Sequence, residues 1–142
     1  MVNPRKAYPV DTGLIPLFDR SGKSNIGHAL ETAVCLELER RHAETTWVRT
    51  GSGREVDFLA RFPGHPPELI QVCADARDRE TARREVMALQ EACAEHPYAV
   101  ARLLALTRDS LPEDTPDGIA AQAAWEWLLE VDASPGLGGW TR

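Results

Sequence analysis

The stretch that decides the fold is TTWVRTGSGREVDFLARFPGHPPELIQVC, residues 45–73. Residues 45–50 are rich in β-branched and aromatic side chains, and after a Gly-Ser-Gly turn residues 54–62 alternate between apolar and polar. Two such segments joined by a short glycine-containing loop predict a β-hairpin. Residues 68–73 follow a second turn and have a nearly continuous apolar centre, which is typical of a strand covered on both faces. We therefore expect three consecutive strands.

The flanking sequence supplies helices. Apolar residues recur every four positions from residue 24 to residue 41, which predicts an amphipathic helix. Residues 78–94 predict a second helix capped by Asp78, residues 101–107 a fourth strand, and residues 117–130 a last helix. The expected order is α-β-β-β-α-β-α, an α/β fold with a mixed central sheet flanked by helices on both faces.

The chain length of 142 residues fits one domain, and no linker divides it. We expect residues 1–24 to form an N-terminal extension and the glycine- and proline-rich residues 134–142 to be a flexible tail. No apolar run is long enough to span a membrane, and no signal peptide is recognisable. The three widely spaced cysteines are typical of reduced core residues, so we expect a cytoplasmic location.

The net charge of −6 does not support binding to nucleic acid by charge alone, because phosphate contacts require a cationic face. Arginines do gather at residues 77–84, but Asp75, Asp78, Glu80 and Glu85 interleave with them. This pattern indicates a solvated helix face with ion pairs such as Glu80 with Arg84.

Polar side chains on three of these elements form the candidate site. Glu31 lies at the edge of the buried stripe of the first helix, and Asp57 lies in the second strand, on the face opposite Val56 and Phe58. Gln71 and Cys73 share one face of the third strand, because side chains alternate along a strand. An acid from the helix, an acid from strand two and an acid-x-lysine pair in strand three make up the PD-(D/E)XK nuclease site.

The chemistry of that site requires charges that this chain lacks in part. Two carboxylates would hold Mg²⁺, with Glu31 and Asp57 as the metal ligands, and a lysine would stabilise the developing charge. Here Gln71 replaces the strand-three acid and Cys73 replaces the lysine. Glu68 is a possible substitute acid if a bulge turns it toward the site. The structural alternative is that Asp57 ends a hairpin ion pair and Glu31 caps a backbone group.

Three other patterns favour structural interpretations. His28, Glu31 and Cys35 share one helix face but have no second ligand cluster for zinc. The sequence Ser21-Gly22-Lys23-Ser24 matches only the end of a P-loop. We expect Trp47, Trp125 and Trp127 in the core, because the last helix offers no cationic neighbours for base stacking.

The chain resembles one family along nearly its whole length. The motifs that carry the resemblance are Lys6-x-Tyr8-x-x-Asp11-x-Gly13-Leu14, Gly27-x-x-Leu30-Glu31-x-x-Val34, Gly53-Arg54-Glu55-Val56-Asp57-Phe58, Leu69-Ile70-Gln71-Val72-Cys73, Arg83-Arg84-Glu85 and Trp125-Glu126-Trp127-Leu128-Leu129. The family is the C-terminal domain of unknown function that follows the ATPase domain in many bacterial and archaeal AAA-type ATPases. The resemblance implies a restriction-endonuclease-like core with Glu31 and Asp57 on the acid positions. It also implies that the chain either stands alone or is part of a longer ATPase.

The expected function is therefore a catalytically degenerate nuclease-like domain with a regulatory or interaction role. Its partner would be an ATPase domain or another protein, with weak nucleic-acid contact as a further possibility, and it would need no cofactor. The alternative is a Mg²⁺-dependent DNA or RNA nuclease that uses Glu31, Asp57 and Glu68 or Gln71. A third hypothesis is a self-associating assembly module, that is, a homo-oligomer.

Overall fold

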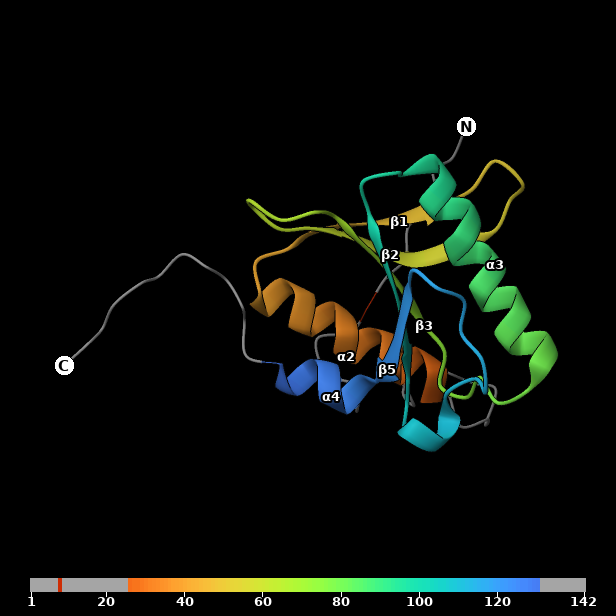
Figure 1. The fold of residues 1–142 in the computed structure, drawn as a ribbon. Helices are drawn as coiled ribbons and strands as arrows, with labels where there is room; N and C mark the ends of the chain where they lie inside the picture. The colour runs from red at the N-terminus through yellow and green to blue at the C-terminus, as the bar shows by residue number, and fades with distance from the viewer. Residues whose placement is uncertain (1–7, 9–25, 131–142) are drawn as a thin grey trace.

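The computed structural model describes Tyr8 and residues 26–130 of the chain (Figure 1). Its elements are, in order, α2 (Ile26–Arg40), β1 (Glu44–Arg49), β2 (Glu55–Arg61), β3 (Glu68–Val72), α3 (Arg79–Glu95), β4 (Val100–Ala105), the short 3₁₀ helix η2 (Arg108–Ser110), β5 (Ile119–Ala123) and α4 (Ala124–Leu129). The predicted P-loop-like segment, the N-terminal extension apart from Tyr8, and the tail lie outside these residues.

The sheet is mixed, as predicted, and its five strands follow chain order from β1 to β5. β1 pairs antiparallel with β2 and β2 pairs antiparallel with β3, whereas β3, β4 and β5 run parallel to one another. Because parallel neighbours cannot be joined by a tight turn, α3 provides the crossover from β3 to β4. The α/β class with helices around a mixed sheet is confirmed.

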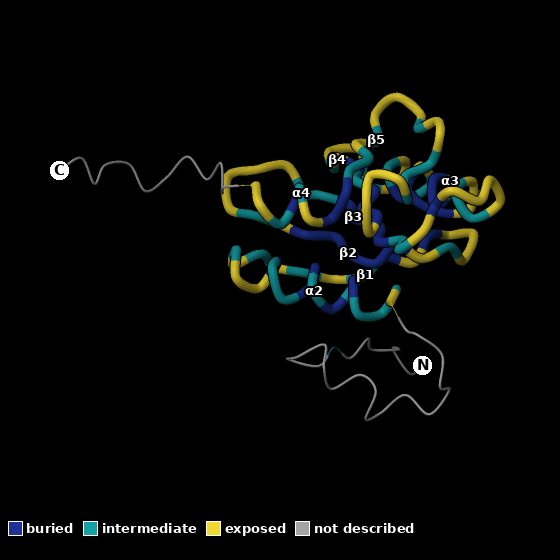
Figure 2. The backbone as a smooth tube through the Cα atoms, turned by 90° about the horizontal axis from the view of Figure 1, so that it is seen from below, coloured by how far each residue is buried: buried dark blue, intermediate teal, exposed yellow. Residues whose placement is uncertain are grey.

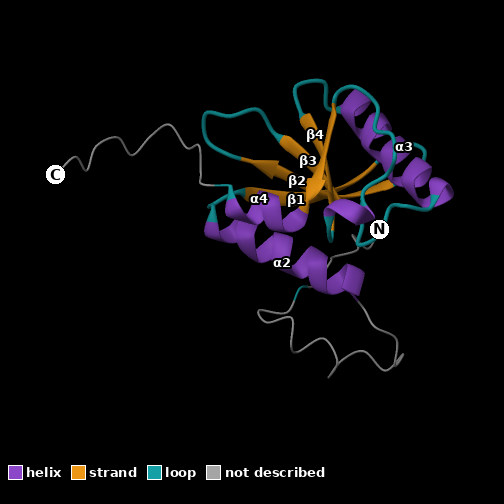
Figure 3. Ribbon diagram, turned by 60° about the horizontal axis from the view of Figure 1, so that its bottom comes forward, coloured by secondary structure: helices purple, strands orange, loops and turns teal. Residues whose placement is uncertain are grey.

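Helices cover both faces of the sheet, and Figure 3 shows α3 on one side with α2 and α4 on the other. Leu69, Leu89 and Leu103 are fully buried between the sheet and α3. Leu38 and Trp127 are buried on the opposite face, where α2 and α4 pack against the sheet. The burial of the backbone in Figure 2 follows this layering, with the dark central strands enclosed by half-exposed helices.

Arg41 joins the two helices of the second face. Its guanidinium lies 4.5 Å from the centre of the Trp127 ring and donates a 2.8 Å hydrogen bond to the Trp127 carbonyl oxygen. The same side chain donates to Glu37 at 2.7 Å. This cation–π contact fixes the end of α2 against α4.

The prediction of one helix over residues 117–130 is wrong in its first half. Residues Ile119–Ala123 form β5, which pairs in parallel with β4 through all five positions, and only Ala124–Leu129 are helical. The alanines of β5 have high helix propensity, but pairing with the exposed edge of β4 overrides that local preference. Trp127 is buried as expected, whereas Trp125 is 47% exposed and is not a core residue.

A bulge in β2 changes the expected alternation of its side chains. Thr46 pairs with Leu59 and Val48 pairs with Val56, so both Asp57 and Phe58 lie opposite one residue of β1. Val56 consequently packs on the α3 face while Phe58 packs on the α2 face. The prediction that Val56 and Phe58 share one side is wrong, because the inserted residue turns the side chains that precede it to the opposite face of the sheet.

No helix in residues 26–130 is long and apolar enough to cross a membrane.

Candidate functional site

The candidate site lies where β2 and β3 separate. The last residues of the two strands that pair through their backbones are Phe58 and Ile70. Beyond them, hydrogen bonds that involve side chains take the place of the backbone-to-backbone hydrogen bonds. The backbone N–H of Asp57 donates to Gln71 Oε1 at 3.1 Å, and the backbone N–H of Val72 donates to Asp57 Oδ2 at 2.9 Å. Both side chains are buried. Each therefore satisfies a backbone donor that would be costly to leave unpaired.

Glu85 of α3 completes a buried network that sequence reasoning did not predict. Gln71 Nε2 donates a hydrogen bond to Glu85 Oε2, and Glu85 Oε1 accepts from Arg84 Nε at 3.1 Å and Arg84 Nη2 at 2.8 Å. The carboxylate of Glu85 is buried, while the Arg84 side chain reaches solvent. The network thus runs from Asp57 inside the sheet to a cation at the surface.

The solvated-face interpretation counted Glu85 among the interleaved acids and is wrong for that residue, which is buried. Arg84 forms its ion pair with Glu85, and among the described residues no ion pair joins it to Glu80. One signal could have revealed Glu85: it is spaced four and seven residues before the buried Leu89 and Ala92. An acid on that stripe must be buried, and a buried acid needs partners.

Cys73 follows β3 and faces α3, on the same side as Gln71, as the alternation of the strand predicts. Its Sγ donates to the carbonyl oxygen of Asp75 at 3.3 Å. Burial raises the pKa of the Cys73 thiol, and the negative charge of Glu85 raises it further. The thiol is consequently neutral near pH 7 and supplies neither the charge of a lysine nor a reactive thiolate.

Glu31 reaches this region from the opposite face of the sheet, and Tyr8 lies against it. The Tyr8 hydroxyl donates to Glu31 Oε2 at 3.4 Å, while its ring stacks on His28 with centroids 6.0 Å apart and contacts Phe58 at 5.8 Å. Burial raises the pKa of Tyr8 above its usual range, and the charges of Glu31 and then Asp57 contribute to the rise. The two predicted acids, Glu31 and Asp57, are therefore both close enough to raise the pKa of the Tyr8 hydroxyl.

Glu68 lies at the other end of β3, away from Asp57. It pairs with Ala60 of β2, and its Oε2 accepts a 3.2 Å hydrogen bond from Arg102 Nε. β3 keeps regular parallel pairing with β4 from Glu68 to Val72, so no bulge turns Glu68 toward the site. The structure does not bring this possible substitute acid to the other candidates.

The donor set does not fit a divalent cation. In the described part of the chain, no three histidine, cysteine or acidic side chains are arranged to hold a metal ion. Asp57 Oδ2 and Gln71 Oε1 each accept a backbone hydrogen bond, and Mg²⁺ prefers a near-octahedral set of oxygen ligands. The possible zinc face is not assembled either, because His28 stacks on Tyr8 and Cys35 is buried.

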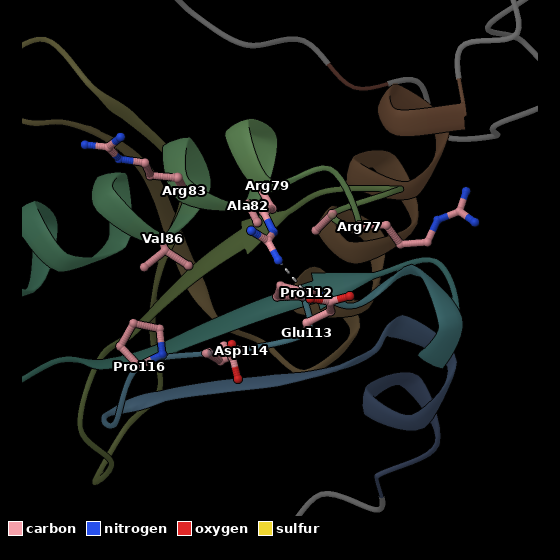
Figure 4. A pocket seen from close by; sticks show the side chains of 11 residues that line it. Arg77, Arg79, Ala82, Arg83, Val86, Pro112, Glu113, Asp114 and Pro116 are labelled. Carbon is pink, nitrogen blue, oxygen red and sulfur yellow. Dashed lines mark ion pairs between the residues drawn. The ribbon is translucent and has the colours of Figure 1, made fainter.

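A cleft of about 560 Å³ lies between the start of α3 and residues 112–116, and none of the candidate site residues lines it. Figure 4 shows Arg77 and Arg83 pointing away from this cleft, while Arg79 points toward Glu113 across it. The Arg79–Glu113 ion pair is 3.8 Å long and fully exposed, and Arg77 is held by Asp75 at 2.6 Å. The cleft therefore lacks convergent polar groups that would orient a ligand.

In comparisons with known proteins, no family model, no curated protein and no solved structure matches this chain. The resemblance to the ATPase-associated domain stays a prediction.

Proposed function

We propose that this chain is a catalytically degenerate PD-(D/E)XK nuclease-like domain that acts through protein contact. The observation that carries the proposal is the position of Gln71. Its amide accepts from the Asp57 backbone with one end and donates to the buried Glu85 carboxylate with the other. A residue at the catalytic acid position thus serves as a structural bridge.

The chemistry of Gln71 explains why an acid does not suit this position. A glutamate there has no N–H to donate, so its carboxylate would meet that of Glu85 within hydrogen-bonding distance. Two such carboxylates cannot both stay ionised when they are buried together. The neutral amide is therefore the group that fits between Asp57 and Glu85.

The loss of charge also argues against catalysis. Gln71 removes one anionic metal ligand, and the neutral thiol of Cys73 removes the cation that would stabilise the transition state. Loss of a single electrostatic stabiliser costs about 10²–10³ in rate, and loss of the metal costs the activated water as well. In this proposal the scaffold is nuclease-like but lacks the catalytic charges, which favours a regulatory or interaction role. The resemblance suggests an ATPase domain as one class of partner.

Calorimetric titration with Mg²⁺ and Mn²⁺, combined with cleavage assays on plasmid, single-stranded DNA and RNA, tests the proposal. We expect the unaltered chain and Asp57→Ala to give the same result, with no specific metal binding and no cleavage. Metal binding that Asp57→Ala abolishes, accompanied by cleavage, would contradict the proposal and favour a metal-dependent nuclease. Arg61→Ala, an exposed change at the far end of β2, is the matched control.

A further inference from the structure

The face of α2 that was a possible half of a zinc site has an aromatic side chain lying against it. His28, Glu31 and Cys35 are spaced three and four residues apart, so they follow one side of the helix. The ring of Tyr8 stacks on His28 with centroids 6.0 Å apart, and its hydroxyl donates to Glu31 Oε2 at 3.4 Å. Cys35 is close as well, since it contributes to the raised pKa of Tyr8.

β2 supplies the other wall around Tyr8. The ring of the buried Phe58 lies 5.8 Å from that of Tyr8 and is tilted by 33°. Ring pairs at such distances attract each other beyond the effect of buried area. A helix and a strand thus hold one ring between them, with a carboxylate to accept from its hydroxyl. We call the four residues that do so the Tyr8 contact surface: His28, Glu31, Cys35 and Phe58.

Tyr8 is not part of the scaffold that it contacts. It lies 23 residues before Glu31 in the chain and belongs to no helix or strand. Its side chain is half-buried, and its hydrogen bond of 3.4 Å is long for a hydroxyl donor. The Tyr8 side chain can therefore leave the contact surface without breaking a backbone hydrogen bond within α2 or between the strands.

We propose that Tyr8 is an autoinhibitory plug, a side chain that covers Glu31 and closes the candidate site from the α2 side. This inference rests on the proposed function and deepens it by naming a regulation of the same site. A partner that recognises Glu31 has to displace Tyr8 first. The chemistry that competes for the contact surface is an aromatic ring that carries a hydroxyl group, because the ring stacks and the hydroxyl donates.

Alkylation of Cys35 tests the plug, because Tyr8 shields this thiol. We expect iodoacetamide to modify Cys35 roughly tenfold faster in Tyr8→Ala than in the unaltered chain, since loss of the cover increases both access and thiolate content. Tyr8→Phe keeps the ring and should raise the rate by only about twofold. Tyr98→Ala changes the exposed second tyrosine and is the matched control, with no change expected. Mass spectrometry reports each thiol, and far-UV circular dichroism verifies folding.

Phenol added in solution separates a specific contact from general loosening of the fold. Truncation of Tyr8 to alanine leaves a hollow of the shape of a phenol ring, and a hollow with apolar walls can bind a matching small molecule. Millimolar phenol should restore the protection of Cys35 in Tyr8→Ala. Cyclohexanol, which cannot stack on His28 and Phe58, should protect less. Equal protection by the two compounds would overturn the inference, as would Cys35 and Cys93 becoming reactive together.

His28→Ala provides a second test if Tyr8→Ala fails to fold. It removes the stacking partner of Tyr8 in the first turn of α2, so alkylation of Cys35 should become a few-fold faster. A folded Tyr8→Ala or His28→Ala chain in which Cys35 stays protected would overturn the inference. Metal binding and cleavage by the unaltered chain would instead contradict the proposed function, so the two failures are distinguishable.

Discussion

The two ends of β3 hold polar side chains by different chemistry. At the first end the carboxylate of Glu68 pairs with the guanidinium of Arg102, and both side chains are partly open to water. At the other end the neutral Gln71 accepts a hydrogen bond from the Asp57 backbone N–H and donates one to the buried carboxylate of Glu85, while the buried Asp57 carboxylate accepts from the Val72 backbone N–H. Water access and a nearby cation allow an acid at one end, whereas an existing buried acid requires an amide at the other.

Among the changes that test this difference, Gln71→Glu should lower the free energy of unfolding the most. It places a second carboxylate beside Glu85 and removes the donor to Glu85 Oε2, so we expect a loss of about 3 kcal/mol in the free energy of unfolding near pH 7. The shared site would hold a proton more tightly in the folded state than in the unfolded state. The loss should therefore diminish as the pH falls toward the range in which one carboxyl is protonated. Urea denaturation at several pH values measures both effects.

Exchanging the two groups should recover most of that loss. In Gln71→Glu combined with Glu85→Gln, the amide and the carboxylate change places and one N–H···O bond can form again. We expect the double variant to regain about 2 kcal/mol relative to Gln71→Glu alone, the size of coupling seen between contacting residues. Additive losses in this double-mutant cycle would show that the amide bridge does not cause the difference between the two ends.

Glu68→Gln should lower the free energy of unfolding by less than Gln71→Glu does. Its partner Arg102 also binds Gln122 and lies 3.7 Å from Glu130, so the guanidinium keeps acceptors after the change. We expect a loss of at most about 1 kcal/mol, as for other partly exposed ion pairs. Urea denaturation at neutral pH compares this variant with Gln71→Glu, and an equal loss would remove the distinction between the ends.

The reactivity of Cys73 offers the finest test. The charge of Glu85 helps to raise the pKa of the Cys73 thiol, whereas burial alone raises that of Cys93. A raised pKa means less thiolate at pH 8, so Glu85→Gln should increase alkylation of Cys73 by a few-fold. Mass spectrometry after iodoacetamide treatment reports both thiols. Cys93 serves as the internal control, and an equal change at both would indicate loosening of the fold.

The sequence predicted elements well where periodicity and pairing agreed. The hairpin, β3, α3 and β4 lie close to their expected residues, because alternation and helical spacing match burial there. β5 was missed because its alanines favour a helix locally while its partner β4 is remote in the sequence. A strand whose only support is tertiary pairing carries little local signal.

The candidate site was predictable in its strand residues only. Asp57 and Gln71 are in contact, and Gln71 and Cys73 share a face, as alternation requires. Glu85 was assigned to the solvated face because it ends a run of alternating charges that indicates a solvated surface. The bulge at Asp57 could not be predicted either, because the apolar residues of β2 alternate along the sequence as they would in a regular strand.

The amide bridge at Gln71 has an evolutionary consequence. If this lineage descended from an active nuclease, a single reversion to glutamate would harm folding before it could restore any chemistry, because Glu85 already occupies the neighbouring space. A return to activity would need position 85 to change first, and that step brings no catalytic benefit by itself. In such a lineage the glutamine would make an inactive state easier to enter than to leave.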